Sequence, residues 1–134
     1  MQEKNFQTLF NKFLAEQEGL PFSEKTSAFE LKLVKAPQKS LPFDAVKPHQ
    51  IRALKLAKKK LIYKISDTGR DQKPFDCFQL VKAKAYVVVL FYTPYANKFV
   101  ILIEVDDFIK EKESSKRKSL TEERAWEIGL KYVL

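Results

Sequence analysis

Apolar residues change their spacing along the chain, and each spacing predicts a type of element. The first group recurs at the helical positions i, i+3, i+4, i+7 and i+8, over Phe6, Leu9, Phe10, Phe13 and Leu14. This spacing predicts a helix over residues 5–18 that has one apolar face.

Residues 26–36 suit a strand, in which side chains alternate between two faces. Glu30 and Lys32 then point to one face, while the apolar side chains that flank them point to the other. A carboxylate beside an ammonium group suits a site that holds a metal ion and a water molecule. It equally suits an ordinary amphipathic strand with an ion pair, which is the commoner meaning of such a pair.

The later elements follow from the same reasoning. Residues 85–92 are almost wholly apolar and rich in β-branched and aromatic residues, which predicts a central strand covered on both faces. Ser119 and Glu122 have the spacing of a capping box, which would open a last helix. The predicted order is a helix over 5–18, a strand over 26–36, a helix from about 48 to 60, strands over 61–65, 75–80, 85–92 and 99–105, and a C-terminal helix.

This order predicts an α/β (α+β) fold in which helices flank a central mixed sheet of four to five strands. The length of 134 residues favours one domain. We expect a core over 1–109, a basic charged connector over 110–118 and a C-terminal helix over 119–134.

The charge balance favours an acidic polymer as the partner. The chain has 25 Lys and Arg residues against 17 Asp and Glu residues, a net charge of +8. Such a surplus suits nucleic acid or an anionic membrane surface. No apolar run is long enough to span a bilayer, the N-terminus does not resemble a signal peptide, and the single Cys77 forms no internal disulfide. We therefore expect a soluble cytoplasmic protein without membrane insertion.

Several kinds of catalytic site are excluded by composition. Only one histidine, His49, is present, Cys77 lies beside Phe78 as a core cysteine would, and three glycines leave no material for a phosphate-binding loop. Carboxylate chemistry remains, with a hard divalent cation such as Mg²⁺ or Mn²⁺ that takes oxygen ligands.

A second carboxylate of interest is Asp76, which begins a predicted strand after the polar loop over 66–74. Phe75 and Phe78 would anchor it in the core, although an aspartate in this position can also merely solvate a strand end.

The helix over 48–60 has two distinct faces. Arg52, Lys55 and Lys59 share one face, and no acidic residue occurs between Lys47 and Lys60. This face would either contact phosphates or simply be solvated. Gln50 lies on the other, apolar face.

Two short motifs together resemble a known family of nucleases. Pro74-Phe-Asp76 combined with Glu30-Leu-Lys32 resembles the signature of the PD-(D/E)XK nuclease superfamily. The segment 29–51, which ends in Pro48-His-Gln-Ile51, is similar to the RecU-type Holliday-junction resolvases and their phage and archaeal relatives. The resemblance covers about residues 26–108. In that family the aspartate strand comes first, so this chain would have a restriction-endonuclease-like core with a permuted element order.

The resemblance implies roles for particular residues. Asp76 and Glu30 would bind the metal ion, with the carbonyl of Leu31 as a third ligand. Lys32 would orient the attacking water, and Gln50 would reach the water or the substrate. The family also has an acidic residue in the first helix, for which four residues of this chain are candidates: Glu3, Gln7, Glu16 and Glu18. Asp67 is a separate candidate for an extra carboxylate.

The implied function is a Mg²⁺- or Mn²⁺-dependent endonuclease, selective for DNA structure and acting as a homodimer because resolution of a junction needs two symmetric cuts. Alternatives are a non-catalytic nucleic-acid-binding domain on the same fold, or a restriction or repair nuclease that cuts linear duplex. Basic residues would contact phosphates without reading bases: Arg52, Lys55, Lys59, Lys73, Lys116, Arg117 and Lys118.

Overall fold

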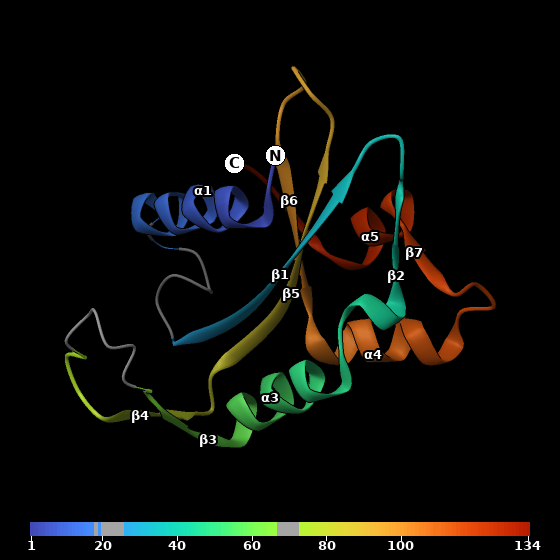
Figure 1. Cartoon of the computed structure of the whole chain (residues 1–134). Coiled ribbons are helices and arrows are strands. Elements are labelled where there is room, and N and C mark those ends of the chain that lie inside the picture. The colour runs from blue at the N-terminus through green and yellow to red at the C-terminus, as the bar shows by residue number, and fades with distance from the viewer. Residues whose placement is uncertain (18, 20–25, 67–72) are drawn as a thin grey trace.

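A mixed four-stranded sheet forms the centre of the computed structural model, which describes residues 1–17, 19, 26–66 and 73–134 (Figure 1). Strand β1 pairs in parallel with β5, and the other neighbours pair antiparallel. The strands in spatial order are β1 (Ser27–Lys35), β5 (Lys84–Tyr92), β6 (Phe99–Glu104) and β8 (Leu130–Val133). A mixed sheet flanked by helices confirms the predicted α/β class.

The alternation of side chains along β5 divides the core into two layers. Tyr86, Val88 and Leu90 pack with the aromatic residues of α1 (Glu3–Glu16) on one face. Ala85, Val87 and Val89 pack on the other face, against three further helices. Those helices are α3 (Pro48–Lys59), α4 (Val105–Ser114) and α5 (Glu122–Ile128). Because both faces are covered, residues 85–92 of β5 are almost wholly apolar, as predicted.

Helix α1 has the predicted spacing of apolar residues, and its apolar face packs on β1. Phe6, Phe10 and Phe13 are all buried. The ring of Phe10 meets the ring of Phe29 edge-on, with 5.1 Å between their centroids. This aromatic contact brings the polar side chains at the start of α1 close to the middle of β1.

Two small sheets complete the described structure. Strand β2 (Ser40–Pro42), followed by a 3₁₀ turn over Phe43–Ala45, pairs with β7 (Ser119–Thr121). Strands β3 (Lys60–Lys64) and β4 (Cys77–Val81) pair only with each other in the described sheets, and we call them the ribbon. The ribbon runs from the end of α3 away from the central sheet (Figure 1).

The predicted connector over 110–118 is wrong in its first half, and the predicted helix over 119–134 is wrong at both ends. Helix α4 continues to Ser114, so only residues 115–118 connect it to β7. Thr121, not Ser119, caps α5, since its Oγ1 accepts a hydrogen bond from the N–H of Arg124 at 3.2 Å.

A close approach of the backbone explains why the last helix is short. A Cβ atom at Gly129 would lie 2.6 Å from Cγ2 of Ile101 and 3.0 Å from the carbonyl oxygen of Leu102. The chain passes directly over β6 at this glycine and continues as the edge strand β8. No helix in the described parts of the chain is long and apolar enough to cross a lipid bilayer.

Candidate functional site

Three of the four predicted catalytic residues meet where β1 faces the first turn of α3. Nζ of Lys32 lies 3.1 Å from Oε1 of Glu30. The same carboxylate oxygen accepts a hydrogen bond of 2.9 Å from Nε2 of Gln50. The structure therefore brings together a carboxylate, an ammonium group and an amide that are up to 20 residues apart in the sequence.

The local structure holds each of these groups in place. Glu30 and Lys32 lie opposite Val87 and Val89 of the buried strand β5. Gln50 is the third residue of α3, and its Oε1 accepts a hydrogen bond from the N–H of Lys47 at 2.9 Å. A glutamine three residues after the cap position is half of a capping box, a signal that was present in the sequence.

Partial burial strengthens the interaction between Glu30 and Lys32. Their side chains are 27% and 15% exposed. Water screens charges poorly in such an environment, so the ammonium group and the carboxylate interact more strongly than a surface pair would.

An open cavity of about 470 Å³ lies between α1 and β1 and reaches Glu30. Its polar lining on the α1 side includes Glu3 and Gln7, with Lys4 and Asn11, while β1 supplies Glu30 and Leu31. Among the candidates in the first helix, the cavity thus favours Glu3 and Gln7. Glu16 does not line it, and Glu18, like Asp67, lies outside the described residues.

Asp76 is not part of this cluster. Its side chain is 89% exposed, and Oδ1 lies 3.1 Å from Nζ of Lys73. No hydrogen bond or ion pair joins it to Glu30, Lys32 or Gln50, all of which the structure describes.

The prediction that Phe75 and Phe78 anchor Asp76 in the core is wrong. These residues are 53% and 39% exposed, and Cys77, expected in the core, is also exposed. The physical reason is that β4 pairs with β3 and not with the central sheet. With about 3.3 Å per residue, the Cys77 end of β4 lies roughly 13 Å from the end that leads into β5.

The donor set fits a hard cation only in part. No group of three His, Cys, Asp or Glu residues within the described ranges is arranged to hold a metal ion. Glu30 and Glu3 both line one cavity, and carboxylates suit Mg²⁺ or Mn²⁺, whereas Asp76 does not fit such a site in this arrangement.

The predicted phosphate-binding residues fall into separate groups. Arg52, Lys55 and Lys59 are exposed along α3, and the other exposed group follows α4 at Lys116, Arg117 and Lys118. Lys73 is paired with Asp76. Lys58, which was not predicted to have a role, pairs with Asp106 of α4, and this hydrogen bond raises the pKa of Lys58.

In comparisons with protein-family models, curated proteins and solved structures, no match to this chain was found. The contacts of Glu30, Lys32 and Gln50 are therefore the main basis for inferring a function.

Proposed function

We propose that this protein is a metal-dependent endonuclease that hydrolyses DNA phosphodiester bonds where β1 faces α3. The observation that carries the proposal is the Glu30 carboxylate, held by Lys32 at 3.1 Å and by Gln50 at 2.9 Å at the edge of a cavity. A part-buried carboxylate that is paired with an ammonium group, in a residue that lines an open space, can hold a cation and a water molecule. An ordinary surface ion pair lacks both the burial and the space.

Each residue has a distinct role in the proposed site. Glu30 would bind Mg²⁺ or Mn²⁺ with the carbonyl of Leu31, and Glu3, which lines the same cavity, is the candidate for a further carboxylate. When bound, the ion would lower the pKa of a water molecule and neutralise charge on the phosphate. Gln50 would fix the orientation of the Glu30 carboxylate, since its own amide is held by the helix cap.

Lys32 would act on the attacking water and on the phosphate. The water oxygen forms a new bond to phosphorus, the bond to the 3′ oxygen breaks, and the departing oxygen takes up a proton. Charge builds up on the phosphate oxygens during this step, and an ammonium group at Lys32 would stabilise it. The products would be a 5′ phosphate and a 3′ hydroxyl.

The basic surface supports DNA as the substrate. Arg52, Lys55 and Lys59 form an exposed row on α3, the same helix that presents Gln50 to Glu30. Such a row can contact phosphates without reading sequence, as a structure-selective nuclease requires. A resolvase-like enzyme would act as a homodimer, so that two sites cut symmetrically.

Cleavage assays on a four-way junction and on linear duplex, with Mg²⁺ or Mn²⁺, test the proposal. We expect cleavage by the wild type, none in EDTA, and a loss of at least about 100-fold for Glu30→Gln and Lys32→Met. Glu16→Gln on α1 is the matched control and should cut normally, since Glu16 does not line the cavity. Circular dichroism shows whether each variant is folded. A wild type that cuts neither substrate, or variants that cut equally well, would refute the enzyme.

The separation of Asp76 from Glu30 favours a second candidate, a non-catalytic nucleic-acid-binding domain. In that case Glu30, Lys32 and Gln50 would form a structural cluster only. Salt-sensitive DNA binding without cleavage under any metal would identify this function. A nuclease of the restriction or repair type would instead cut the linear duplex at least as fast as the junction.

A further inference from the structure

The ribbon exposes aromatic side chains that have no cover in the described structure. Tyr63 of β3 lies opposite Phe78 of β4, and the two rings stack with 5.4 Å between centroids. Phe75 meets Phe78 edge-on at 6.4 Å. Tyr63 is 56% exposed. A contiguous apolar surface of this kind on a two-stranded ribbon usually marks a place where something binds.

The charge around these rings identifies the kind of partner. Asp76 is the only acidic residue in 58–66 and 73–84, and it is paired with Lys73. Four exposed lysines at the ribbon and its base make no ion pair with a described residue: Lys59, Lys60, Lys64 and Lys82. A second copy of this chain would bring like charges together here, whereas an acidic polymer would neutralise them.

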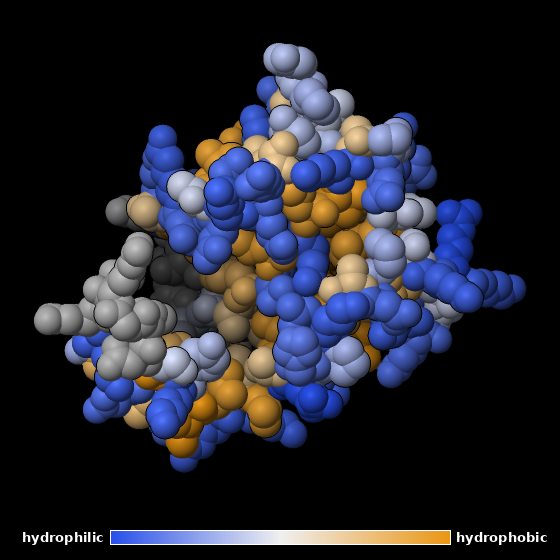
Figure 2. All heavy atoms as spheres, in the orientation of Figure 1, coloured by the Kyte–Doolittle hydropathy of each residue, from blue (hydrophilic) through white to orange (hydrophobic). Residues whose placement is uncertain are grey.

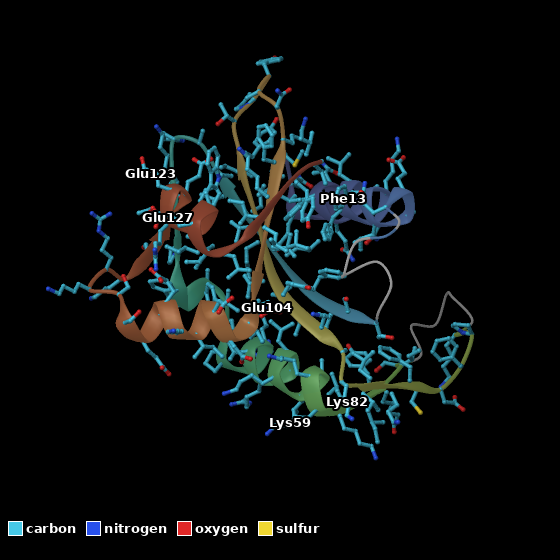
Figure 3. The ribbon with its side chains drawn as sticks, turned by 180° about the vertical axis from the view of Figure 1, so that it is seen from behind. Phe13, Lys59, Lys82, Glu104, Glu123 and Glu127 are labelled. Carbon is cyan, nitrogen blue, oxygen red and sulfur yellow. The ribbon has the colours of Figure 1, made fainter. Side chains whose placement is uncertain are left out.

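The arrangement resembles a stacking platform with a basic border. In Figure 3, Lys59 and Lys82 lie next to each other at the base of the ribbon, where the N–H of Lys82 donates to the carbonyl of Lys59 at 3.1 Å. Hydrophobic and hydrophilic side chains are mixed over β3, β4 and α3 (Figure 2). Aromatic rings that stack on bases beside lysines that bind phosphates are typical of binding to single-stranded nucleic acid.

We infer that the ribbon binds the unpaired bases of single-stranded or branched DNA, with Tyr63 and Phe78 stacking on bases and the lysines contacting phosphates. In a continuous duplex the faces of the bases are already stacked, so this surface discriminates against it. The inference rests on DNA as the proposed substrate but not on cleavage. It identifies unpaired bases as the feature of the DNA that the protein recognises.

The ribbon and the candidate site lie within reach of one DNA strand. The ribbon leads into β5 at Lys84, whose N–H donates to the carbonyl of Thr26, and Lys84 lies opposite Ser27. Glu30 is three residues further along β1. At about 3.3 Å per residue, Glu30 lies roughly 10 Å along β1 from Ser27 at the base of the ribbon, a span that a few nucleotides cover.

Fluorescence anisotropy in EDTA tests the inference independently of catalysis. The probes are a labelled single strand, a four-way junction and a blunt duplex. Tyr63→Ala and Phe78→Ala should each weaken binding to the single strand about 5- to 140-fold and weaken binding to the junction, while leaving duplex binding unchanged. Lys64→Gln should weaken binding to all three probes and lower the salt dependence. Tyr95→Ala is the control, because Tyr95 is fully exposed in the β5–β6 connection, away from the ribbon (Figure 1).

Tyr63→Leu separates loss of the ring from loss of the fold. It preserves an apolar side chain, so it should bind as poorly as Tyr63→Ala while keeping the wild-type circular dichroism spectrum. Equal loss on duplex and single strand, or wild-type affinity in both ring variants, would overturn the inference. Ring variants that bind DNA normally but change the oligomeric state measured by sedimentation would also overturn it, since the ribbon would then be a contact between two copies. Normal binding with no cleavage by the wild type would refute the proposed enzyme and leave this inference standing.

Discussion

The amide of Gln50 connects the start of α3 to the carboxylate of Glu30. Its Nε2 donates to Oε1 of Glu30 at 2.9 Å, and its Oε1 accepts from the N–H of Lys47 at 2.9 Å. Only a side chain with a donor at one atom and an acceptor at the other satisfies both partners. The cap of a helix and the orientation of a functional carboxylate thus depend on a single residue.

Gln50→Glu should therefore be more damaging than its small change in shape suggests. The new carboxylate retains the acceptor for Lys47 but faces Glu30 with a like charge, and the hydrogen bond to Glu30 is lost. We expect the free energy of unfolding to fall by about 1–3 kcal/mol and DNA cleavage to be lost. Urea unfolding and the junction assay measure both effects. Gln38→Glu, at an exposed position, is the control, and equal stability of the two variants would contradict the predicted link.

Asp76→Ala separates the contribution of the ribbon from that of the cluster at β1. In a single chain Asp76 pairs with Lys73 and makes no hydrogen bond or ion pair with Glu30, so we expect this variant to cut DNA as well as the wild type. Glu3→Gln should reduce cleavage, because Glu3 lines the cavity that reaches Glu30. The measurement is the rate of junction cleavage at saturating Mg²⁺.

A loss of cleavage in Asp76→Ala would contradict that assignment, and a mixing experiment would then locate the residue. Asp76→Ala and Lys32→Ala are mixed and allowed to exchange subunits. Restored cleavage would mean that Asp76 of one copy completes the site of the other. No restoration would mean that Asp76 acts within its own chain after movement of the ribbon.

Gly129→Ala should destabilise the protein through a clash with β6. The added Cβ would lie 2.6 Å from Cγ2 of Ile101, and a backbone carbonyl at 3.0 Å limits relief by movement of the chain. We expect a loss of about 1–3 kcal/mol in the free energy of unfolding, measured by urea denaturation. Glu123→Ala on the exposed side of α5 should change it by less than about 0.5 kcal/mol. Equal effects of the two substitutions would show that β8 does not pass over β6 in this way.

Tyr86 should make the protein less stable at alkaline pH. Burial raises the pKa of its phenol above the ordinary value near 10, and the carboxylate of Glu104, its partner on β6, raises it further. The folded state therefore holds the proton more tightly than the unfolded state. Its contribution to stability is complete below about pH 10 and is lost as pH rises through the folded pKa.

Urea midpoints measured below and above pH 10 test this effect. Tyr86→Phe should show a smaller fall with pH than the wild type. Some fall should remain, because the raised pKa of Lys58 acts in the same direction. An identical fall in both proteins would mean that Tyr86 does not contribute.

Sequence patterns predicted the elements whose burial depends on their own spacing. The helical repeat of Phe6, Phe10 and Phe13, and the unbroken apolar run of β5, each describe a surface that must be covered. The alternation around Glu30 also predicted which face this residue shares with Lys32. Gln50 was predicted on the inward face of its helix, and it does reach Glu30.

Sequence patterns did not predict which strands would pair with each other. The apolar composition of residues 77–81 is compatible both with a strand of the central sheet and with a strand that pairs with β3 alone. The structure has the second pairing, and the pairing determines where Asp76 lies. The C-terminal residues 130–133 are equally compatible with a helix. Their strand depends on the approach of Gly129 to β6, which is a contact with a distant part of the chain.

The parallel pairing of β1 with β5 has a consequence for how the protein folds. Ser27 lies opposite Lys84, which is 57 positions later in the sequence, so β1 cannot enter the sheet before most of the chain is available. Pairings across such long separations form slowly, because a large loop must close first. Gln50 can meet Glu30 earlier, but the buried strand that supports Glu30 arrives last. The assembly of the site should therefore coincide with the rate-limiting step of folding, and fragments that end before residue 84 should have neither the sheet nor the site.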